Sequence, residues 1–518
     1  MKSIREKGIL SIKGLAVVII LVLTAAPVLY LIFGSVASLF TGTLPSDSGI
    51  SGELFVKSVI LYLASAGFSM LLGLLSAIGI WVFFEKHSAK IAILIILMIL
   101  IPPFIHVQSW ISFIDGINNF IAALLGVAPN FTGNFAVILT VAFSYLPVTA
   151  GLCLIALLSI PPELSDMCLT DGTGRKSFLK LYLPFIYPAL ILSGLLVFLL
   201  NINDYGIASV FGVNVYALEL FSRFSAGGTI YSIFFASIPL LLVSAIIMML
   251  FAQYIRKGGL SFAGLNGKNP FKKEKFIKVP AIPGLIVLAF FMLVPIISLL
   301  YEAFKVKGIF ETLSDSTPEL AYSLFISVIA AVVCLIPALL FAFMFNKSRY
   351  KIWLLAASAL PFIIPAPIAG ISLIEMWNKP LLNLIYQSPI MPSIGLITRF
   401  VFIEAIILSV AVSRIDPALI DNLRLHYPGI IKFFTCTLRL IWKESVSAMM
   451  IVFALSMGEF GVTLLVTPPG YQTLTVKIYN YVHYGSSETV AAMCLFMMLV
   501  VLSVSFGTFF LLTGKKDG

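Results

Sequence analysis

Long, almost unbroken runs of apolar residues recur along the whole chain and are separated by short polar stretches. A helix needs ~20 such residues to cross the apolar core of a bilayer. The runs do not alternate apolar with polar residues, as the strands of a membrane β-barrel do. We therefore predict an all-α membrane protein with about twelve transmembrane helices. The predicted spans lie near residues 14–36, 58–84, 90–113, 135–159, 185–204, 230–254, 280–302, 320–345, 352–376, 394–413, 445–467 and 488–513.

The overall composition supports this fold class. Of the 518 residues, 60% are hydrophobic and 11% are charged, whereas soluble domains are about 45–50% apolar and about 25% charged. Basic residues precede the first apolar run, as they do in a signal peptide. The run at 14–36 is longer than the apolar region of a signal peptide, so we expect it to remain as an uncleaved span.

Lysine and arginine are distributed unevenly between the polar segments. If the N-terminus is cytoplasmic, 26 of the 33 Lys and Arg residues fall in cytoplasmic segments. Cytoplasmic loops of membrane proteins carry such an excess, so we predict that both termini are cytoplasmic. The net charge of +10 follows from the same bias and requires no nucleic-acid partner. The other seven basic residues lie outside or at the outer ends of spans: Lys57, Arg223, Lys305, Lys307, Lys379, Arg399 and Lys477.

Sequence patterns for catalysis or for metal binding are missing. The five cysteines fall in spans or cytoplasmic loops, which indicates no disulfide framework. The four histidines do not have the spacing of metal ligands, and there is no HExxH motif or nucleophile elbow. The segment DGTGRKS at 171–177 lacks the glycine spacing of a phosphate-binding loop. We predict no catalytic residue and no metal site in this chain.

The two halves of the chain repeat one another at an offset of 255 residues. Pro162, Asp166 and Asp204 align with Pro417, Asp421 and Glu459 without a gap. Each half holds six predicted spans, so the halves have the same orientation and form a parallel repeat. The predicted organisation is a first half at 1–255, a basic cytoplasmic linker at 256–279 and a second half at 280–518.

Residues 160–184 form a charged, glycine-containing loop between two spans. Leu164, Met167 and Cys168 recur at helical spacing, which predicts a short helix with these side chains on one side. Gly172 can end that helix in a left-handed turn. Short helices of this kind lie on the membrane surface or fill a groove on another protein. Because the loop recurs in the second half, the sequence favours a partner with two equivalent grooves.

This loop resembles the cytoplasmic loop motif of ATP-binding-cassette (ABC) importer permeases, which reads Glu-Ala-Ala, three residues, Gly, and later Leu-Pro. Asp166-Met167-Cys168 stand in place of Glu-Ala-Ala, Gly172 is the glycine, and Leu183-Pro184 end the motif. The distance from Gly172 to Pro184 is one residue shorter than usual. The resemblance implies that the loop, with Arg175 and Lys176 in it, couples the chain to an ATPase.

The second copy of the motif departs further from the family pattern. Asp421-Asn422-Leu423 stand for Glu-Ala-Ala, Tyr427 replaces the glycine, and Leu438-Arg439 replace Leu-Pro. The second copy therefore lacks the glycine that would form the bend at this position. Pro428-Gly429 offer a substitute one residue later.

The resemblance extends over nearly the whole chain, to fused twelve-span permeases of the iron(III)/thiamine type with a MetI-like fold. The passages at 203–228 and 458–485 are the most similar to iron(III) permeases. The resemblance implies a non-enzymatic subunit of the bacterial inner membrane, in contact with lipid. Its implied partners are two copies of a cytoplasmic ABC ATPase, which bind ATP and Mg²⁺, and an extracytoplasmic substrate-binding protein. The chain itself would bind no cofactor.

The expected substrate is ferric iron, with thiamine, 2-aminoethylphosphonate or a polyamine as alternatives. The binding protein would hold the ferric ion and deliver it, so the permease needs no metal ligands of its own. A different class, the secondary transporters, also contains twelve-span proteins with two parallel halves. Such a protein would not need paired amphipathic loops on its cytoplasmic side, and the paired loops therefore argue against it.

Ionisable residues inside spans are costly and mark candidate functional sites. Asp204 and Glu459 occupy equivalent positions near the outer ends of two spans, and Asn201 and Asn203 accompany Asp204. We expect these four residues to line the translocation pathway near its outer mouth. The alternative is that they cap helices or make structural hydrogen bonds. Weaker candidates are Glu375, Glu404, His106 and Gln108. The last two follow Pro102-Pro103, whose counterparts in the second half are roughly Pro361 and Pro365, and prolines at these positions suggest broken or kinked helices.

Overall fold

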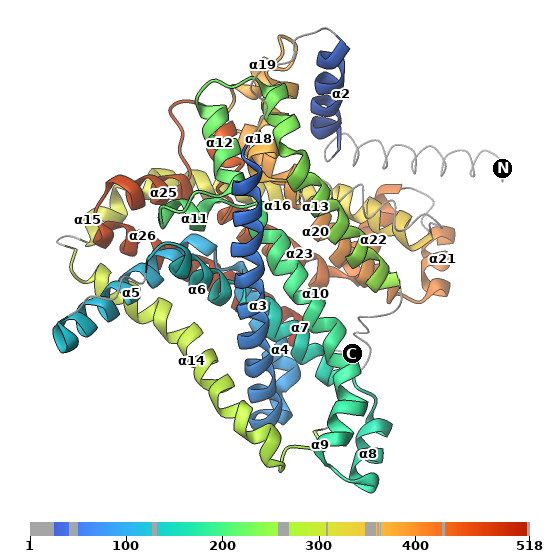
Figure 1. Cartoon of the computed structure of the whole chain (residues 1–518). Helices are drawn as coiled ribbons and strands as arrows, with labels where there is room; N and C mark the ends of the chain where they lie inside the picture. Colours follow the sequence, from blue (N-terminus) through green and yellow to red (C-terminus); the bar gives the residue numbers. More distant parts are fainter. Residues whose placement is uncertain are drawn as a thin grey trace.

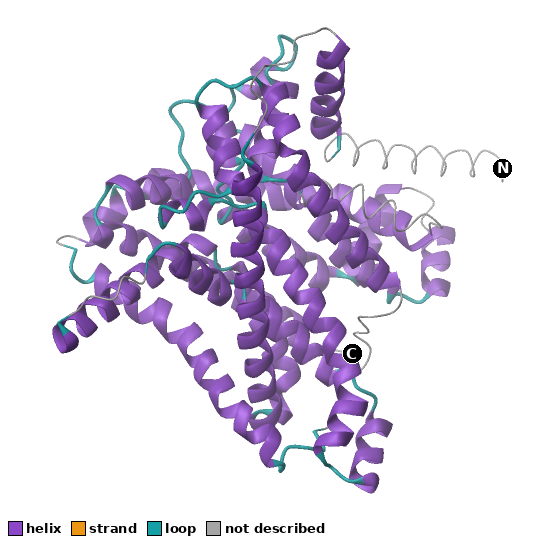
Figure 2. Cartoon of the chain, in the orientation of Figure 1, coloured by secondary structure: helices purple, strands orange, loops and turns teal. Residues whose placement is uncertain are grey.

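The computed structural model describes residues 25–40, 50–126, 132–256, 269–306, 309–347, 359, 362, 364–426 and 430–514. All regular secondary structure within these ranges is helical, as Figure 2 shows. The predicted all-α fold class is therefore confirmed. Continuous apolar runs favour helices in a membrane because a helix satisfies every backbone hydrogen bond internally.

Seven helices of the described residues are long and apolar enough to cross a bilayer. The two longest are α3 (Gly52–Phe83) and α16 (Thr317–Lys347). The others are α10 (Leu183–Ile202, with the helical turns Arg175–Ser177 and Phe178–Tyr182 before it), α13 (Ile230–Arg256), α14 (Lys275–Ala303), α20 (Met391–Ser413) and α26 (Ser487–Thr513). These seven correspond to seven of the twelve predicted spans.

Two further predicted spans, 90–113 and 135–159, are bent pairs of helices, and a third, 445–467, starts within the second helix of such a pair. The pair formed by Glu85–Leu100 (η1, α4, η2) and α5 (Pro103–Leu125) bends by 88° at the predicted proline break. The pair α6 (Asn134–Ser144) and α7 (Leu146–Leu158) bends by 43°. The pair α22 (Ile430–Leu440) and α23 (Trp442–Met457) bends by 87°. Counting each pair as one span gives up to ten membrane-spanning elements in the described residues.

The remaining two predicted spans, 14–36 and 352–376, lie partly outside the described residues. Their described parts are the shorter apolar helices α2 (Ala26–Phe40) and α18 (Ala366–Trp377). The number of twelve spans therefore stays a prediction. The described helices nevertheless form a multi-pass helical membrane protein. Of the prolines that the sequence pairs with Pro102-Pro103, Pro361 lies outside the described residues and Pro365 directly precedes α18.

One predicted span ends earlier than its apolar run suggests. The sequence predicts a span to residue 467, but α23 ends at Met457 and a separate short helix, α24 (Thr463–Val466), follows. Gly458 interrupts the helix where the chain passes close to Pro102: a Cβ atom on Gly458 would lie 2.7 Å from Pro102 Cγ. This position therefore requires glycine, and the chain changes direction there.

The helices that open each predicted half pack on the opposite half (Figure 1). Helix α14, from the predicted second half, packs against α3 and α5 of the first and also against α26. Helix α2, from the predicted first half, packs against α18 of the second as well as against α13. Each of these two helices therefore packs against helices of both predicted halves. The outward side of α14 exposes Ile282, Ile286, Leu293 and Ile297, a row of apolar side chains that suits lipid and not water.

Candidate functional site

Glu459 lies in the loop between α23 and α24 and is almost completely buried. Its carboxylate oxygens accept hydrogen bonds from the backbone N–H groups of Val462, at 2.8 Å, and Thr463, at 2.9 Å. Val462 directly precedes α24 and Thr463 is its first residue, so both N–H groups lack partners within the helix. Glu459 therefore caps this short helix, and its role in the translocation pathway stays a prediction.

Asp204 has an equivalent position in the first half, in the loop between α10 and the short helix α11 (Gly206–Val210). Its Oδ1 accepts a hydrogen bond from the N–H of Gly206 at 3.3 Å. The hydroxyl of Tyr62 in α3 donates to the backbone carbonyl of Asp204 at 3.3 Å. Asp204 and Glu459 thus each lie next to a short helix and accept a hydrogen bond from its backbone, α11 in one case and α24 in the other.

Arg399 brings the two acids into one electrostatic cluster. It lies in α20, and its Nη1 is 3.6 Å from Glu459 Oε1, with 19% and 5% of the two side chains exposed. Its charge also acts on the Asp204 carboxylate. None of the described residues gives Nη1 a hydrogen-bond acceptor. We call Asp204, Arg399 and Glu459 the charged cluster; it joins one acid of the first half to an arginine and an acid of the second.

Aromatic side chains fill the space beside the charged cluster. Tyr205 is fully buried, and its ring stacks on Phe221 at 5.1 Å and meets Phe460 edge-on at 5.8 Å between centroids. Phe460 packs in turn against Tyr479 at 4.2 Å, and the Tyr479 hydroxyl donates to Ser209 Oγ at 3.4 Å. The Tyr205–Phe460 and Tyr479–Ser209 contacts cross between the predicted halves, so the loops that carry the two acids are closed on one another in this structure.

Asn201 and Asn203 make hydrogen bonds within the first half. Asn201 Nδ2 donates to the carbonyl of Val197 at 2.7 Å. Asn203 Nδ2 donates to the carbonyl of Leu199 at 3.1 Å and to Ser244 Oγ at 2.9 Å. These bonds tie the end of α10 to its own backbone and to α13. The role of both residues in the pathway stays a prediction.

The weaker candidates have varied surroundings. Glu375 forms an ion pair with Lys379 at 2.8 Å, and Gln108 Nε2 donates to Ser487 Oγ at 2.8 Å. The buried ring of His106 stacks on Phe291. Glu404 is fully buried in α20, and neither of its carboxyl oxygens has a hydrogen-bond partner among the described residues.

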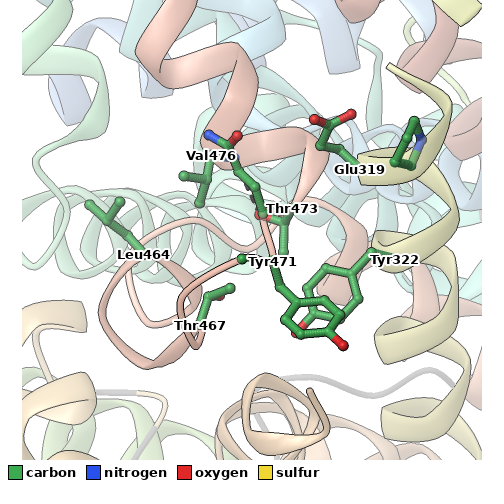
Figure 3. Close-up of a pocket in the computed structure, with 10 residues that line it drawn as sticks. Glu319, Tyr322, Leu464, Thr467, Tyr471, Thr473 and Val476 are labelled. Carbon is green, nitrogen blue, oxygen red and sulfur yellow. Dashed lines mark hydrogen bonds between the residues drawn. The ribbon is translucent and has the colours of Figure 1, made fainter. Parts of the chain in front are cut away.

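A cavity of about 630 Å³ lies between the start of α16 and the segment at 464–476 (Figure 3). Glu319, Tyr322, Tyr471 and Thr473 are among its lining residues, and the rings of the two tyrosines lie side by side with centroids 5.1 Å apart. Lys477 pairs with Glu319 at 3.0 Å. The carboxylate is therefore neutralised by the chain itself, so the cavity offers polar hydroxyls and aromatic faces and no free negative charge.

Both cavity and charged cluster are attached to the segment that follows α24. Thr473 Oγ1 and Thr475 Oγ1 share a hydrogen bond of 3.0 Å, and Thr475 Oγ1 also donates to the backbone carbonyl of Glu459 at 3.2 Å. These two hydrogen bonds therefore link the wall of the cavity to the backbone of Glu459.

The first loop forms the predicted short helix, α8 (Pro162–Asp171), which ends at Gly172 with φ of 105°. This left-handed backbone favours glycine. α9 (Arg175–Ser177) and a π-helical turn (Phe178–Tyr182) lead into α10, where Pro184 lies in the first turn. Figure 1 shows α8 and α9 at the lower edge of the view, beyond the start of α10.

The side chains of α8 divide between two faces. Cys168 is buried, and Ser165 shares a 2.8 Å hydrogen bond with the hydroxyl of the buried Tyr182. Met167 and Leu169 are 48% and 60% exposed. The prediction that Met167 and Cys168 share one side is therefore wrong: Cys168 packs inward and Met167 points outward. On the outward side Asp166, Arg175 and Lys176 are also exposed.

The second loop repeats this arrangement. Helix α21 (Pro417–His426) has the same length as α8 and begins 255 residues after it. Asp421 and Asn422 are exposed, as are Leu419 and Leu425. α22 follows and bends sharply into α23. Tyr427 and the proposed bend at Pro428-Gly429 lie outside the described residues.

Comparison with known proteins gives a local similarity. No protein-family profile matches this chain. A segment of 66 residues is 36% identical to the "Putative 2-aminoethylphosphonate transport system permease protein PhnV" of Salmonella paratyphi A, and 35% identical to the proteins of that name from Salmonella typhimurium and Salmonella choleraesuis. The match covers 13% of this chain and 25% of each relative. The chain thus spans about a quarter of the length of these curated relatives.

Proposed function

We propose that this chain is the transmembrane permease of an ABC importer and has no enzymatic activity of its own. The observation that carries the proposal is the pair of loop helices, α8 and α21, which have equal lengths and lie 255 residues apart in the two halves. Each exposes apolar side chains next to charged ones, as expected of a helix that fills a groove on a partner. The local similarity to transport permeases supports the same conclusion.

In this proposal the halves 1–255 and 280–518, joined by the linker 256–279, form one permease for two copies of a cytoplasmic ABC ATPase. Each ATPase holds one loop helix. ATP and Mg²⁺ bind to the ATPases, because the sequence offers no phosphate-binding loop. When ATP draws the ATPases together, the loops move with them and shift the permease between two states that differ in their contacts.

The charged cluster and its aromatic neighbours are the proposed closure of the pathway. Asp204 and Glu459 belong to different halves, and Arg399 interacts with both. Separating the halves would part Asp204 from Arg399 and Glu459, and the ring of Tyr205 from that of Phe460. An extracytoplasmic binding protein would supply substrate when the closure opens. We place the chain in a bacterial inner membrane with both termini cytoplasmic, which is the orientation that the basic residues favour.

Ferric iron is the proposed substrate, on the resemblance of 203–228 and 458–485 to iron(III) permeases. The 66-residue match favours 2-aminoethylphosphonate as the second candidate, because the relatives are named for its transport. Thiamine and polyamines remain alternatives. Uptake of radiolabelled ferric iron and of labelled 2-aminoethylphosphonate by the native host, with and without the chain, distinguishes the first two: the substrate is the one whose uptake the deletion abolishes.

The rival class is a secondary transporter, which would move substrate without an ATPase. Reconstituting the chain in liposomes with and without its copurified ATPase separates the two classes. The proposal predicts uptake only with the ATPase and ATP. Uptake driven by an ion gradient in the absence of the ATPase would support the rival.

A further inference from the structure

The residues that precede α14 are fixed to the first half by backbone and side-chain hydrogen bonds. Asn269 Nδ2 donates to the carbonyl of Trp81, at the end of α3, at 3.2 Å. Asn269 Oδ1 accepts from the N–H of Phe271 at 3.0 Å. The end of the linker therefore follows a defined path along α3.

Phe271 inserts into the core of the first loop and is fully buried. Its ring meets Tyr182 edge-on at 4.9 Å and Phe178 at 5.5 Å between centroids. Tyr182 in turn holds α8 through its hydrogen bond with Ser165. A linker residue is thus part of the small core on which the first loop helix is built.

Polar contacts surround this aromatic core. Thr173 Oγ1, between α8 and α9, donates to Glu274 Oε1 at 2.7 Å. Glu85 accepts hydrogen bonds from the N–H of Asn269 at 3.2 Å and from Lys272 Nζ at 2.9 Å. Glu85 and Lys272 form an ion pair that joins the linker to the segment directly after α3.

α14 begins immediately after these contacts, at Lys275, and is held closely against α3. A Cβ atom on Gly284 would overlap the backbone carbonyl of Leu75, and Ser76 Oγ donates to the Gly284 carbonyl at 3.3 Å. Further along, Phe291 and Val294 of α14 share a buried cluster with Met493 and Met497 of α26. α14 therefore connects the first loop to the last helix of the second half.

We propose that residues 269–274 are a mechanical anchor that makes α14 move together with the first ATPase-coupling loop. Movement of that loop would then reach the second half through α14 as well as through the second loop. Phe271 is the positioning residue of the anchor. The inference rests on the proposed function, because it supposes that an ATPase moves the loop.

Crosslinking tests whether the loop and the anchor move as one body. In a cysteine-free background, Thr173→Cys and Glu274→Cys are joined by a short, reducible methanethiosulfonate crosslinker, in the complex with the ATPase and binding protein. The anchor predicts that ATP-driven uptake after crosslinking equals that of the same variant before crosslinking. Uptake that is lost on crosslinking and regained on reduction would overturn it. Thr173→Cys alone, treated with the same reagent, is the control for modification.

Substitution of Phe271 tests whether the anchor transmits movement. Phe271→Ala should lower the substrate transported per ATP hydrolysed by roughly tenfold, within the range by which mutations change coupling between sites, while ATP hydrolysis continues. Phe271→Leu should restore most of the loss because it fills the aromatic core. An unchanged ratio in Phe271→Ala would contradict the inference. Absence of ATP-dependent uptake in the unmodified protein would instead contradict the proposed function.

Discussion

Arg399 Nη1 lies 3.6 Å from Glu459 Oε1, and both side chains are largely buried. The pair joins α20 to the loop that follows α23, and the arginine also acts on Asp204 of the first half. The charged cluster therefore connects the predicted first half of the chain to the predicted second half, and the first prediction concerns its charge balance.

Removing only one charge of the pair should destabilise the protein. Arg399→Gln leaves the buried Glu459 carboxylate without its cation, at a cost of about 3 kcal/mol in the free energy of unfolding. The double variant Arg399→Gln with Glu459→Gln should recover part of that loss. Thermal unfolding of the purified proteins in detergent measures both. If the stability lost in the double variant equals the sum of the losses in Arg399→Gln alone and Glu459→Gln alone, the two side chains do not interact.

Conservative amide variants separate a capping role from a charge role for the two acids. Asp204→Asn and Glu459→Gln each retain a carbonyl oxygen that can accept a backbone N–H, but they remove the negative charge. We expect the combined variant to fold and to lose most of its uptake, because the charged cluster loses its partners for Arg399. The combined Asp204→Ala and Glu459→Ala variant should lose uptake as well. Normal uptake by the alanine variant would remove both acids from the pathway.

We predict that Glu404 destabilises the folded protein. Its carboxyl group is fully buried without a hydrogen-bond partner among the described residues, and an unsatisfied buried polar group costs about 1–3 kcal/mol. Glu404→Leu should therefore raise the unfolding temperature. The control is Glu375→Leu, because Glu375 already has an ion-pair partner in Lys379. Its replacement should therefore not raise the unfolding temperature. A lower unfolding temperature for Glu404→Leu would show that the acid has a stabilising partner.

Two serines have the same structural role in the two halves. Ser58 Oγ accepts from the N–H of Tyr216, the first residue of α12 (Tyr216–Ser225), at 2.9 Å. Ser323 Oγ accepts from the N–H of Leu474, the first residue of α25 (Leu474–Tyr484), at 2.8 Å. We expect Ser58→Ala and Ser323→Ala each to cost about 1–2 kcal/mol, since each leaves a buried N–H unsatisfied.

The control for these serines is Ser65→Ala in α3, because Ser65 Oγ donates only to the carbonyl of Leu61 in its own helix among the hydrogen bonds of the described residues. Its loss should cost less than either capping serine. Denaturation by urea in detergent compares the three variants. If only one of Ser58→Ala and Ser323→Ala lowered the free energy of unfolding, the two serine contacts would not be equivalent.

The sequence predicted the fold class well because the length and continuity of an apolar run are sufficient to indicate a membrane helix. It predicted the break near Pro102-Pro103, since proline removes a backbone donor. It did not predict the 87° bend between α22 and α23, which occurs at Ile441 without a proline or glycine. Bends of that kind depend on tertiary packing, which no local pattern records.

The site was predicted in part. Asp204 and Glu459 were found because they align in the repeat, but Arg399 was assigned only to an outer edge. Its partner Glu459 is distant in sequence, and only the fold brings them together. A single arginine inside the apolar run at 394–413 was the available signal. The faces of α8 were also misjudged, because neighbouring residues such as Met167 and Cys168 lie about 100° apart around a helix.

The most direct test of ATPase coupling measures the ATPase that copurifies with the chain from its native membrane. We predict that the intact chain retains an ABC ATPase and shows ATP-driven uptake. A chain with 166–176 replaced by Gly and Ser, or with the exposed Leu169 changed to Glu, should insert normally but retain neither. An intact chain that purifies without any ATPase under all nucleotide conditions, or loop variants with unchanged uptake, would contradict the proposed coupling.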